Sequence, residues 1–185
     1  MIKNSISTII LNKRNIEDFA FERNELLKQA KTEWVLFLDS DEKLAKPISK
    51  VSDKYDGYIL KRKNYFLGQY VGTDNIVRLG KKSSGKWHRK VHETWEIKNI
   101  GQLDNYIIHN TAHSLNDYIN KINFYSKLHA QANKEEGKKS NLFKIIFFPS
   151  GKFIVTLIKS KNVVFSIMQS FHSFLAWTEL YFLHS

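Results

Sequence analysis

A run of apolar residues that leads directly into three carboxylates constrains the fold of this chain more than any other feature. Val35–Leu38 follows Trp34 and precedes Asp39-Ser40-Asp41-Glu42. A short continuous apolar run is typical of a strand buried on both faces, and open α/β sheets bind ligands at the carboxyl ends of such strands. Asp39 and Asp41 lie two residues apart, so both can face one hard cation such as Mg²⁺ or Mn²⁺. The alternative is an acidic turn that only ends a strand.

Composition narrows the class of protein. With 185 residues and 42% hydrophobic content, the chain can bury a core, and one domain is the default. The absence of cysteine excludes disulfides and thiolate zinc sites. The opening Met1–Ser5 is too polar for a signal peptide, which predicts a cytoplasmic protein. The net charge of +11 favours nucleic acid, anionic membrane or phosphorylated substrates, but no nucleic-acid motif is present.

The first part of the chain has the pattern strand, helix, strand. Ser5–Leu11 is β-branched and predicts a strand, and Asn12–Asn15 predicts a turn. Asp18 can cap a helix from Phe19 to about Lys31, which leads into the central strand. A connection of this length permits a right-handed parallel crossover.

Beyond the acidic loop the pattern predicts further short elements. Pro47 fits the first turn of a short helix over residues 44–54. Strands are expected at 57–60, 76–79 and 106–109, and residues 87–97 alternate loosely. Ser114 begins a capping-box-like start to a helix that continues to about Ala132.

The last third of the chain is apolar and aromatic. We expect a charged linker over residues 133–141 and an apolar helical tail over 142–185, with the first tail segment broken at Pro149-Ser150-Gly151. Residues 163–183 carry one formal charge, Glu179, but their serines and other polar residues make a poor membrane-spanning helix. An interfacial helix with basic flanks such as Lys159 and Lys161 fits better, and a helical hairpin packed on the domain is the alternative.

Several motifs, taken jointly and in order, resemble the family 2 glycosyltransferases with the GT-A fold, and more narrowly the lipopolysaccharide-core β-glucosyltransferase branch. The motifs are Asp18-Phe19-Ala20-Phe21-Glu22-Arg23-Asn24, the stretch from Ala30 to Glu42, Arg62-Lys63-Asn64-Tyr65-Phe66-Leu67-Gly68, Lys90-Val91-His92-Glu93 and Ile107-Ile108-His109. The resemblance implies an α/β domain over residues 1–132, with a mixed, Rossmann-like sheet flanked by helices.

The resemblance also implies a reaction and roles for individual residues. A sugar would pass with inversion from a nucleotide-sugar donor to a lipid-linked or cell-envelope glycan acceptor, assisted by Mg²⁺ or Mn²⁺. Metal ligands would be Asp41, with Asp39 on the metal or the donor ribose, and His109. Glu93 would be the catalytic base, or alternatively a surface ion-pair partner of Arg89 or Lys90. The remaining expected contacts are Arg23, Asn24, Arg89 and Lys90 with the donor, and Tyr65, Phe66 and Trp87 with the acceptor, although aromatics are more often core.

The chain departs from the family pattern at its beginning. The strand at residues 5–11 corresponds to the family's third strand, so the first two strand–helix units, which hold much of the nucleotide base, have no counterpart. The central strand would then expose an unpaired edge. Three explanations are open: a truncated gene product, a second chain or homodimer that covers the edge, or a rearranged core in which residues 5–11 lie directly beside residues 34–38.

Three functional hypotheses follow. The first is a glycosyltransferase that is cytoplasmic and peripheral on the inner face of the cell membrane. The second is a catalytically impaired remnant or subunit that needs a partner chain for the nucleotide half-site. The third, a nucleic-acid binder, rests only on charge and aromatic content.

Overall fold

The computed structural model describes residues 5–13, 16–48 and 50–183, and it contains two compact units. Unit 1 comprises Met1–Asn64 and Thr73–Asn110, and unit 2 comprises Tyr65–Gly72 and Thr111–Ser185. The expected domain limits at residues 132 and 141 stay predictions. The turn expected at Asn12–Asn15 includes Arg14 and Asn15, which lie outside the described residues.

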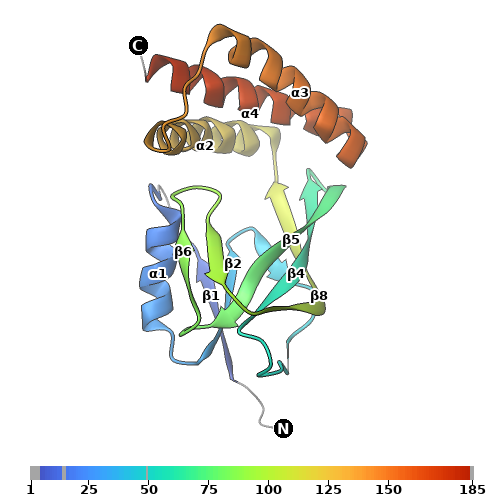
Figure 1. The fold of residues 1–185 in the computed structure, drawn as a ribbon. Coiled ribbons are helices and arrows are strands. Elements are labelled where there is room, and N and C mark those ends of the chain that lie inside the picture. The colour runs from blue at the N-terminus through green and yellow to red at the C-terminus, as the bar shows by residue number, and fades with distance from the viewer. Residues whose placement is uncertain (1–4, 14–15, 49, 184–185) are drawn as a thin grey trace. The chain divides into compact units, whose positions relative to one another are not determined.

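Unit 1 is a mixed α/β unit whose sheet carries the central strand (Figure 1). The six-stranded sheet has the order β1-β2-β5-β4-β8-β3, with β6 and β7 as a separate hairpin. The strands are β1 (Ile6–Leu11), β2 (Trp34–Asp39), β3 (Glu42–Leu44), β4 (Gly57–Phe66), β5 (Gln69–Lys81), β6 (Gly85–His88), β7 (Thr94–Ile97) and β8 (Ile100–Ala112).

The strand expected at residues 5–11 lies directly beside the central strand. β1 pairs with β2 in parallel, from Ile6 opposite Trp34 to Leu11 opposite Asp39. On its other side β2 pairs antiparallel with β5, where Leu36 lies opposite Leu79. The crossover between β1 and β2 contains α1 (Phe19–Gln29), whose first turn is capped by the Asp18 side chain accepting from the Phe21 N–H, as predicted.

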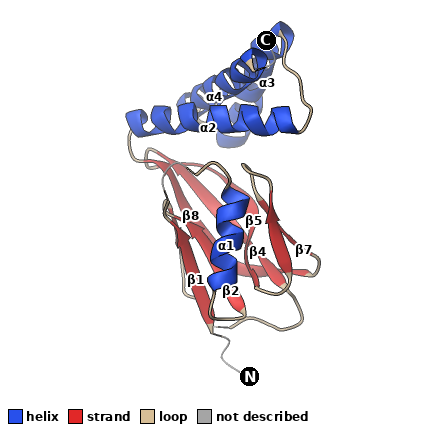
Figure 2. Ribbon diagram, turned by 90° about the vertical axis from the view of Figure 1, so that its left-hand side faces the viewer, coloured by secondary structure: helices blue, strands red, loops and turns tan. Residues whose placement is uncertain are grey.

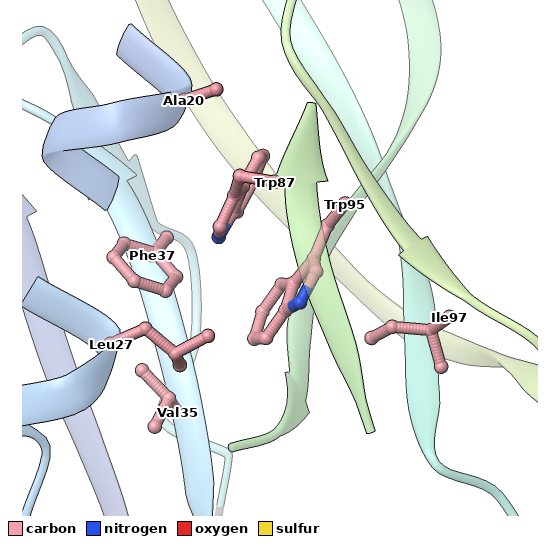
Figure 3. Packing of buried hydrophobic residues seen from close by; sticks show 7 residues of the cluster. All are labelled: Ala20, Leu27, Val35, Phe37, Trp87, Trp95 and Ile97. Atoms are coloured by element: carbon pink, nitrogen blue, oxygen red, sulfur yellow. The ribbon is translucent and has the colours of Figure 1, made fainter. Parts of the chain in front are cut away.

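The central strand is buried on both faces, which confirms the interpretation of its apolar run. Val35 and Phe37 pack on one face with Ala20 and Leu27 of α1 and with Trp87, Trp95 and Ile97 of the β6–β7 hairpin (Figure 3). Figure 2 shows α1 lying along this face of the sheet. Leu36 and Leu79 belong to the cluster on the opposite face. Because side chains alternate along a strand, Asp39 projects toward the α1 side.

The prediction of a short helix over residues 44–54 is wrong. Glu42–Leu44 instead forms β3 and pairs with β8, with Glu42 opposite His109. The backbone then continues its hydrogen bonding to β8, since the Ala45 N–H donates to the Tyr106 carbonyl. Outside residue 49, no helix is described in this segment. The pairing with β8 takes the backbone groups of residues 42–45, so a helix cannot begin at residue 44.

Unit 2 is built mainly of three helices. They are α2 (Leu115–Glu135), α3 (Leu142–Ser160) and α4 (Val163–Phe182), capped by Ser114, Asn141 and Asn162 respectively. α4 packs against both α2 and α3. Phe66 and Val71, from the tip of the β4–β5 hairpin, join Tyr118 and Ile122 in the core of this unit.

The break expected within the tail does not occur. Pro149 lies inside the continuous helix α3, where it is buried. The Pro149 carbonyl accepts a hydrogen bond from the Ser170 hydroxyl of α4, so packing against α4 supports the helix at this point. Over the described residues, no helix is both long and apolar enough to cross a membrane.

Candidate functional site

A carboxylate held between two arginines forms the centre of the candidate site. Asp39, the last residue of β2, accepts from Arg23 Nη2 through Oδ1 and from Arg78 Nη2 through Oδ2, the latter at 2.6 Å. Arg23 comes from α1 and is fully buried, and Arg78 comes from β5 and is 6% exposed. Elements far apart in the sequence therefore bring their charges to the carboxyl end of β2, where the apolar run predicted a ligand site.

Glu93 joins this centre from the loop between β6 and β7. Its Oε1 accepts from Arg23 Nε at 2.9 Å and lies 3.7 Å from Arg78 Nη1. The Glu93 side chain is 13% exposed. Glu93 therefore contacts the two buried arginines, and its expected role as the base stays a prediction.

The network continues across the sheet from Arg78. Glu42 has no exposed side-chain surface and lies 3.4 Å from Arg78 Nη2 and 3.0 Å from Arg62 Nη1. Arg62 then makes a two-pronged contact with Asp74, at 3.0 and 2.6 Å. Three arginines and four carboxylates are joined in this way, which leaves a formal charge of −1 on the network.

Charges within the network shift the pKa values of Asp39, Arg78 and Asp74. Burial alone would raise the pKa of Asp39, but the charges of Arg78 and Arg23 outweigh burial and lower that pKa. For Arg78, burial acts to lower the pKa, and the charges of Asp39, Glu42 and Glu93 raise it above its usual value. The pKa of Asp74 is likewise lowered, against the effect of burial, by its hydrogen bond with Arg62.

Asp41 follows Asp39 by two residues, and its side chain lies close to that of His109 on β8. The Asp41 Oδ2 and His109 Nε2 atoms are 3.5 Å apart, and the Asp41 carbonyl accepts from the Asn110 N–H. His109 Nδ1 contacts the Asn64 side-chain oxygen at 2.7 Å, which orients the ring. A carboxylate and an imidazole suit a divalent metal. The described part of the chain holds no group of three or more potential metal-ligating side chains.

Asn24 contacts the backbone of β6, and its expected donor contact stays a prediction. Its side-chain amide donates to the Trp87 carbonyl at 2.9 Å and accepts from the Trp87 N–H at 3.0 Å. Asn24 thereby fixes α1 to β6. Arg89 and Lys90 are exposed in the following loop, and the Lys90 carbonyl accepts from the Phe19 N–H at the start of α1. Their donor-binding roles stay predictions.

The expected acceptor platforms are mostly core residues. Trp87 is 3% exposed and stacks with Trp95, and Phe66 is 2% exposed and packs edge-on against Tyr118. Neither ring has a free face to offer a sugar, which gives no support to an acceptor role. Tyr65 is half-buried and contacts Tyr70 within unit 2.

Sequence reasoning missed Arg78 and the roles of Glu42 and Arg62. Arg78 stands beside Val77 and Leu79 in a β-branched, apolar stretch, and a single charge in such a strand is the signal that could have identified it. Glu42 belongs to the acidic motif after the central strand, but the motif alone does not predict its contacts with Arg62 and Arg78. Its burial depends on the pairing of β3 with β8, which no local pattern predicts.

A known bacterial protein is similar in sequence to most of this chain. The chain is similar to the lipopolysaccharide core biosynthesis glycosyltransferase LpsC of Rhizobium meliloti (strain 1021), with 27% identity over 152 residues. The alignment covers 74% of this chain and 56% of LpsC, so the chain spans about half the length of that relative. No protein-family model matches the chain.

Proposed function

We propose that this chain acts as an inverting, metal-assisted glycosyltransferase of the family 2 type with a GT-A-like domain. The donor is a nucleotide-sugar, and the acceptor is a lipopolysaccharide or other lipid-linked glycan of the cell envelope. The observation that carries the proposal is the gathering of Arg23, Asp39, Arg78 and Glu93 at the carboxyl end of β2. The similarity to LpsC supports the same reaction class.

Glu93 is the proposed base. In the transfer, the acceptor hydroxyl gives its proton to the Glu93 carboxylate while its oxygen forms a bond to the anomeric carbon of the sugar. The bond from that carbon to the diphosphate oxygen breaks, and the nucleoside diphosphate leaves with the electron pair. Arg23 holds Glu93 through Oε1, so this contact positions the carboxylate.

Asp41 and His109 are the proposed metal ligands. Their Oδ2 and Nε2 atoms are close enough to face one ion, and Mg²⁺ is commonly held by one or two protein groups plus substrate phosphates. The absence of a third protein ligand among the described residues is compatible with that arrangement. Such an ion would supply positive charge for the departing diphosphate. Asp39, whose two oxygens face arginines, would orient Arg23 and Arg78.

The first experiment is calorimetric titration of the purified protein with UDP, GDP and ADP, each with and without Mn²⁺. We expect metal-dependent binding of at least one nucleotide, and Asp41→Asn should weaken it at least tenfold. Asp104→Asn is the matched control, because Asp104 is an exposed acid on β8, the strand that also carries His109. Absence of binding at millimolar nucleotide would refute independent donor binding and favour a subunit that needs a second chain.

The second experiment separates chemistry from binding. Glu93→Gln keeps an oxygen that can accept from Arg23, so the nucleotide affinity should stay within about twofold of the wild type. Release of nucleotide from the bound nucleotide-sugar, with core oligosaccharide as acceptor, should fall by about 10²–10⁴-fold. An active Glu93→Gln enzyme would rule out the base role.

A further inference from the structure

The two C-terminal helices have the reverse of the polarity expected for helices in water. The residues that α3 and α4 bury are mostly small or polar, namely Pro149, Thr156, Ser166, Ala176 and Leu180. Most of the exposed side chains of the same helices are large and apolar: Leu142, Phe143, Ile146, Phe147, Phe148, Ile154, Val155, Ile158, Val163, Val164, Ile167, Phe171, Phe174 and Phe182. A water-facing helix normally buries such residues and exposes polar ones.

Several polar side chains inside unit 2 donate hydrogen bonds to backbone carbonyls or to another side chain. Ser166 Oγ donates to the Asn162 carbonyl at 2.6 Å, and Ser170 Oγ donates to the Pro149 carbonyl of α3 at 2.8 Å. Gln169 Nε2 donates to the Tyr118 hydroxyl of α2 at 2.7 Å. Helices that associate in lipid use small residues and interhelical hydrogen bonds in this way. An exposed apolar surface of this extent marks a site of contact with a membrane or with another protein.

The charge of this segment indicates what covers the surface. Residues 139–185 contain five lysines and one acid, Glu179, which gives a formal charge of +4. Lys159 and Lys161 lie at the turn between α3 and α4, and Lys152 is exposed along α3. Lysine side chains can bury their methylene stems and reach phosphate groups. A second copy of the same surface would bring two +4 segments together, whereas an anionic bilayer complements the charge.

We propose that α3 and α4 form an interfacial hairpin that lies in the plane of an anionic bilayer surface. The exposed phenylalanine, isoleucine and valine side chains enter the acyl boundary, and the lysines contact lipid phosphates. Because neither helix is long and apolar enough to cross a membrane, both lie along the surface. Binding to lipid requires no nucleotide, so this inference and the proposed catalytic function can fail separately.

Site-specific labelling of the whole protein tests the proposal directly, since the chain has no native cysteine. Ile154→Cys and Phe171→Cys place an environment-sensitive fluorophore on the apolar surface, and Gln131→Cys places it on an exposed position of α2. With vesicles of phosphatidylcholine and phosphatidylglycerol, the first two labels should shift to the blue and be quenched by lipids that carry a nitroxide on the acyl chain. The label at position 131 should not change.

Charge variants provide an independent measurement. Lys152→Gln with Lys159→Gln should weaken binding to anionic vesicles about 30-fold, as expected for the loss of two lysines near the headgroups. Lys50→Gln with Lys98→Gln removes the same charge from exposed positions of unit 1 and should weaken binding less than threefold. Equal losses for the two pairs would overturn the assignment of the surface to α3 and α4.

Light scattering in the absence of vesicles tests whether a second copy of the chain covers the apolar surface. A monomer whose labels at 154 and 171 become buried only with vesicles supports the proposal. A dimer in which both labels are already protected, and which does not bind vesicles, would overturn it and assign the apolar surface to self-association.

Discussion

Replacement of Arg23 by methionine tests whether the buried charge network stabilises unit 1. Arg23 has no exposed side-chain surface and hydrogen-bonds both Asp39 and Glu93, while its guanidinium carbon lies 4.7 Å from the centre of the Trp87 ring. Methionine fills a similar volume and keeps an apolar contact with the ring. The variant therefore removes the charge with little loss of packing.

The expected loss in the free energy of unfolding follows from the hydrogen bonds of Arg23 to Asp39 and Glu93. Hydrogen bonds to charged groups contribute about 1.5–3 kcal/mol each. Removal of one member of a buried ion pair typically costs about 3–5 kcal/mol, because its partners stay charged and poorly solvated. We expect the free energy of unfolding to fall by about 3–5 kcal/mol in Arg23→Met, toward the lower end because Asp39 keeps Arg78 as a partner.

Guanidinium chloride unfolding monitored by tryptophan emission measures this change, because Trp34, Trp87 and Trp95 all lie in the core of unit 1. Lys28→Met, also on α1, is the matched control. Its side chain is 70% exposed and pairs only across the surface with Glu25, so the expected change is below about 0.5 kcal/mol. In Arg23→Met/Asp39→Asn the removal of one carboxylate should recover about 1–3 kcal/mol. A loss below about 1 kcal/mol in Arg23→Met, with no recovery in the double variant, would refute the reasoning.

Two further predictions concern stability. Folding lowers the pKa of Asp39, so below about pH 5 the unfolded chain binds more protons than the folded chain. The stability that Asp39 contributes is therefore present above its unfolded pKa of about 3.9, and it is lost as the pH falls through the folded pKa. Urea midpoints between pH 6 and pH 3 should therefore decline less steeply in Asp39→Asn than in the wild type, and parallel curves would contradict this linkage. In Gly85→Ala, a Cβ atom would lie 2.2 Å from the Glu96 carbonyl oxygen in the β6–β7 hairpin, so thermal unfolding should show a loss of about 1–3 kcal/mol. Gly151→Ala, in α3 with no atom within 4 Å of the added Cβ, should be neutral or slightly stabilising, and a loss equal to that of Gly85→Ala would argue against the steric explanation.

Local patterns predicted the parts of the fold that depend on local chemistry. The Asp18 cap, the helix after it and the doubly buried strand at residues 34–39 each follow from residue types in one window. The stretch after the doubly buried strand also pointed to Asp41, and the family resemblance implied a metal role for His109; the structure brings the two side chains to 3.5 Å.

Contacts between distant segments decided what the patterns could not predict. Residues 44–54 favour a short helix locally, but the pairing of Glu42–Leu44 with β8 prevents it. Pro149 suggests a break, but the contact with Ser170 keeps α3 continuous. Arg78 lies 39 residues from Asp39 in the sequence, so its role becomes visible only when β5 is placed beside β2.

The β4–β5 hairpin limits where the chain can be divided, because its strands belong to both compact units. Tyr65–Gly72 is part of unit 2, while the residues on either side of it are part of unit 1. Deleting the chain after residue 110 would remove Ala112, Tyr118 and Ile122, which bury Phe66 and Val71. Unit 1 would then carry an apolar hairpin tip into water, where it favours aggregation. Loss of unit 2 would thus expose apolar side chains on strands that unit 1 retains, which makes the chain difficult to divide by truncation.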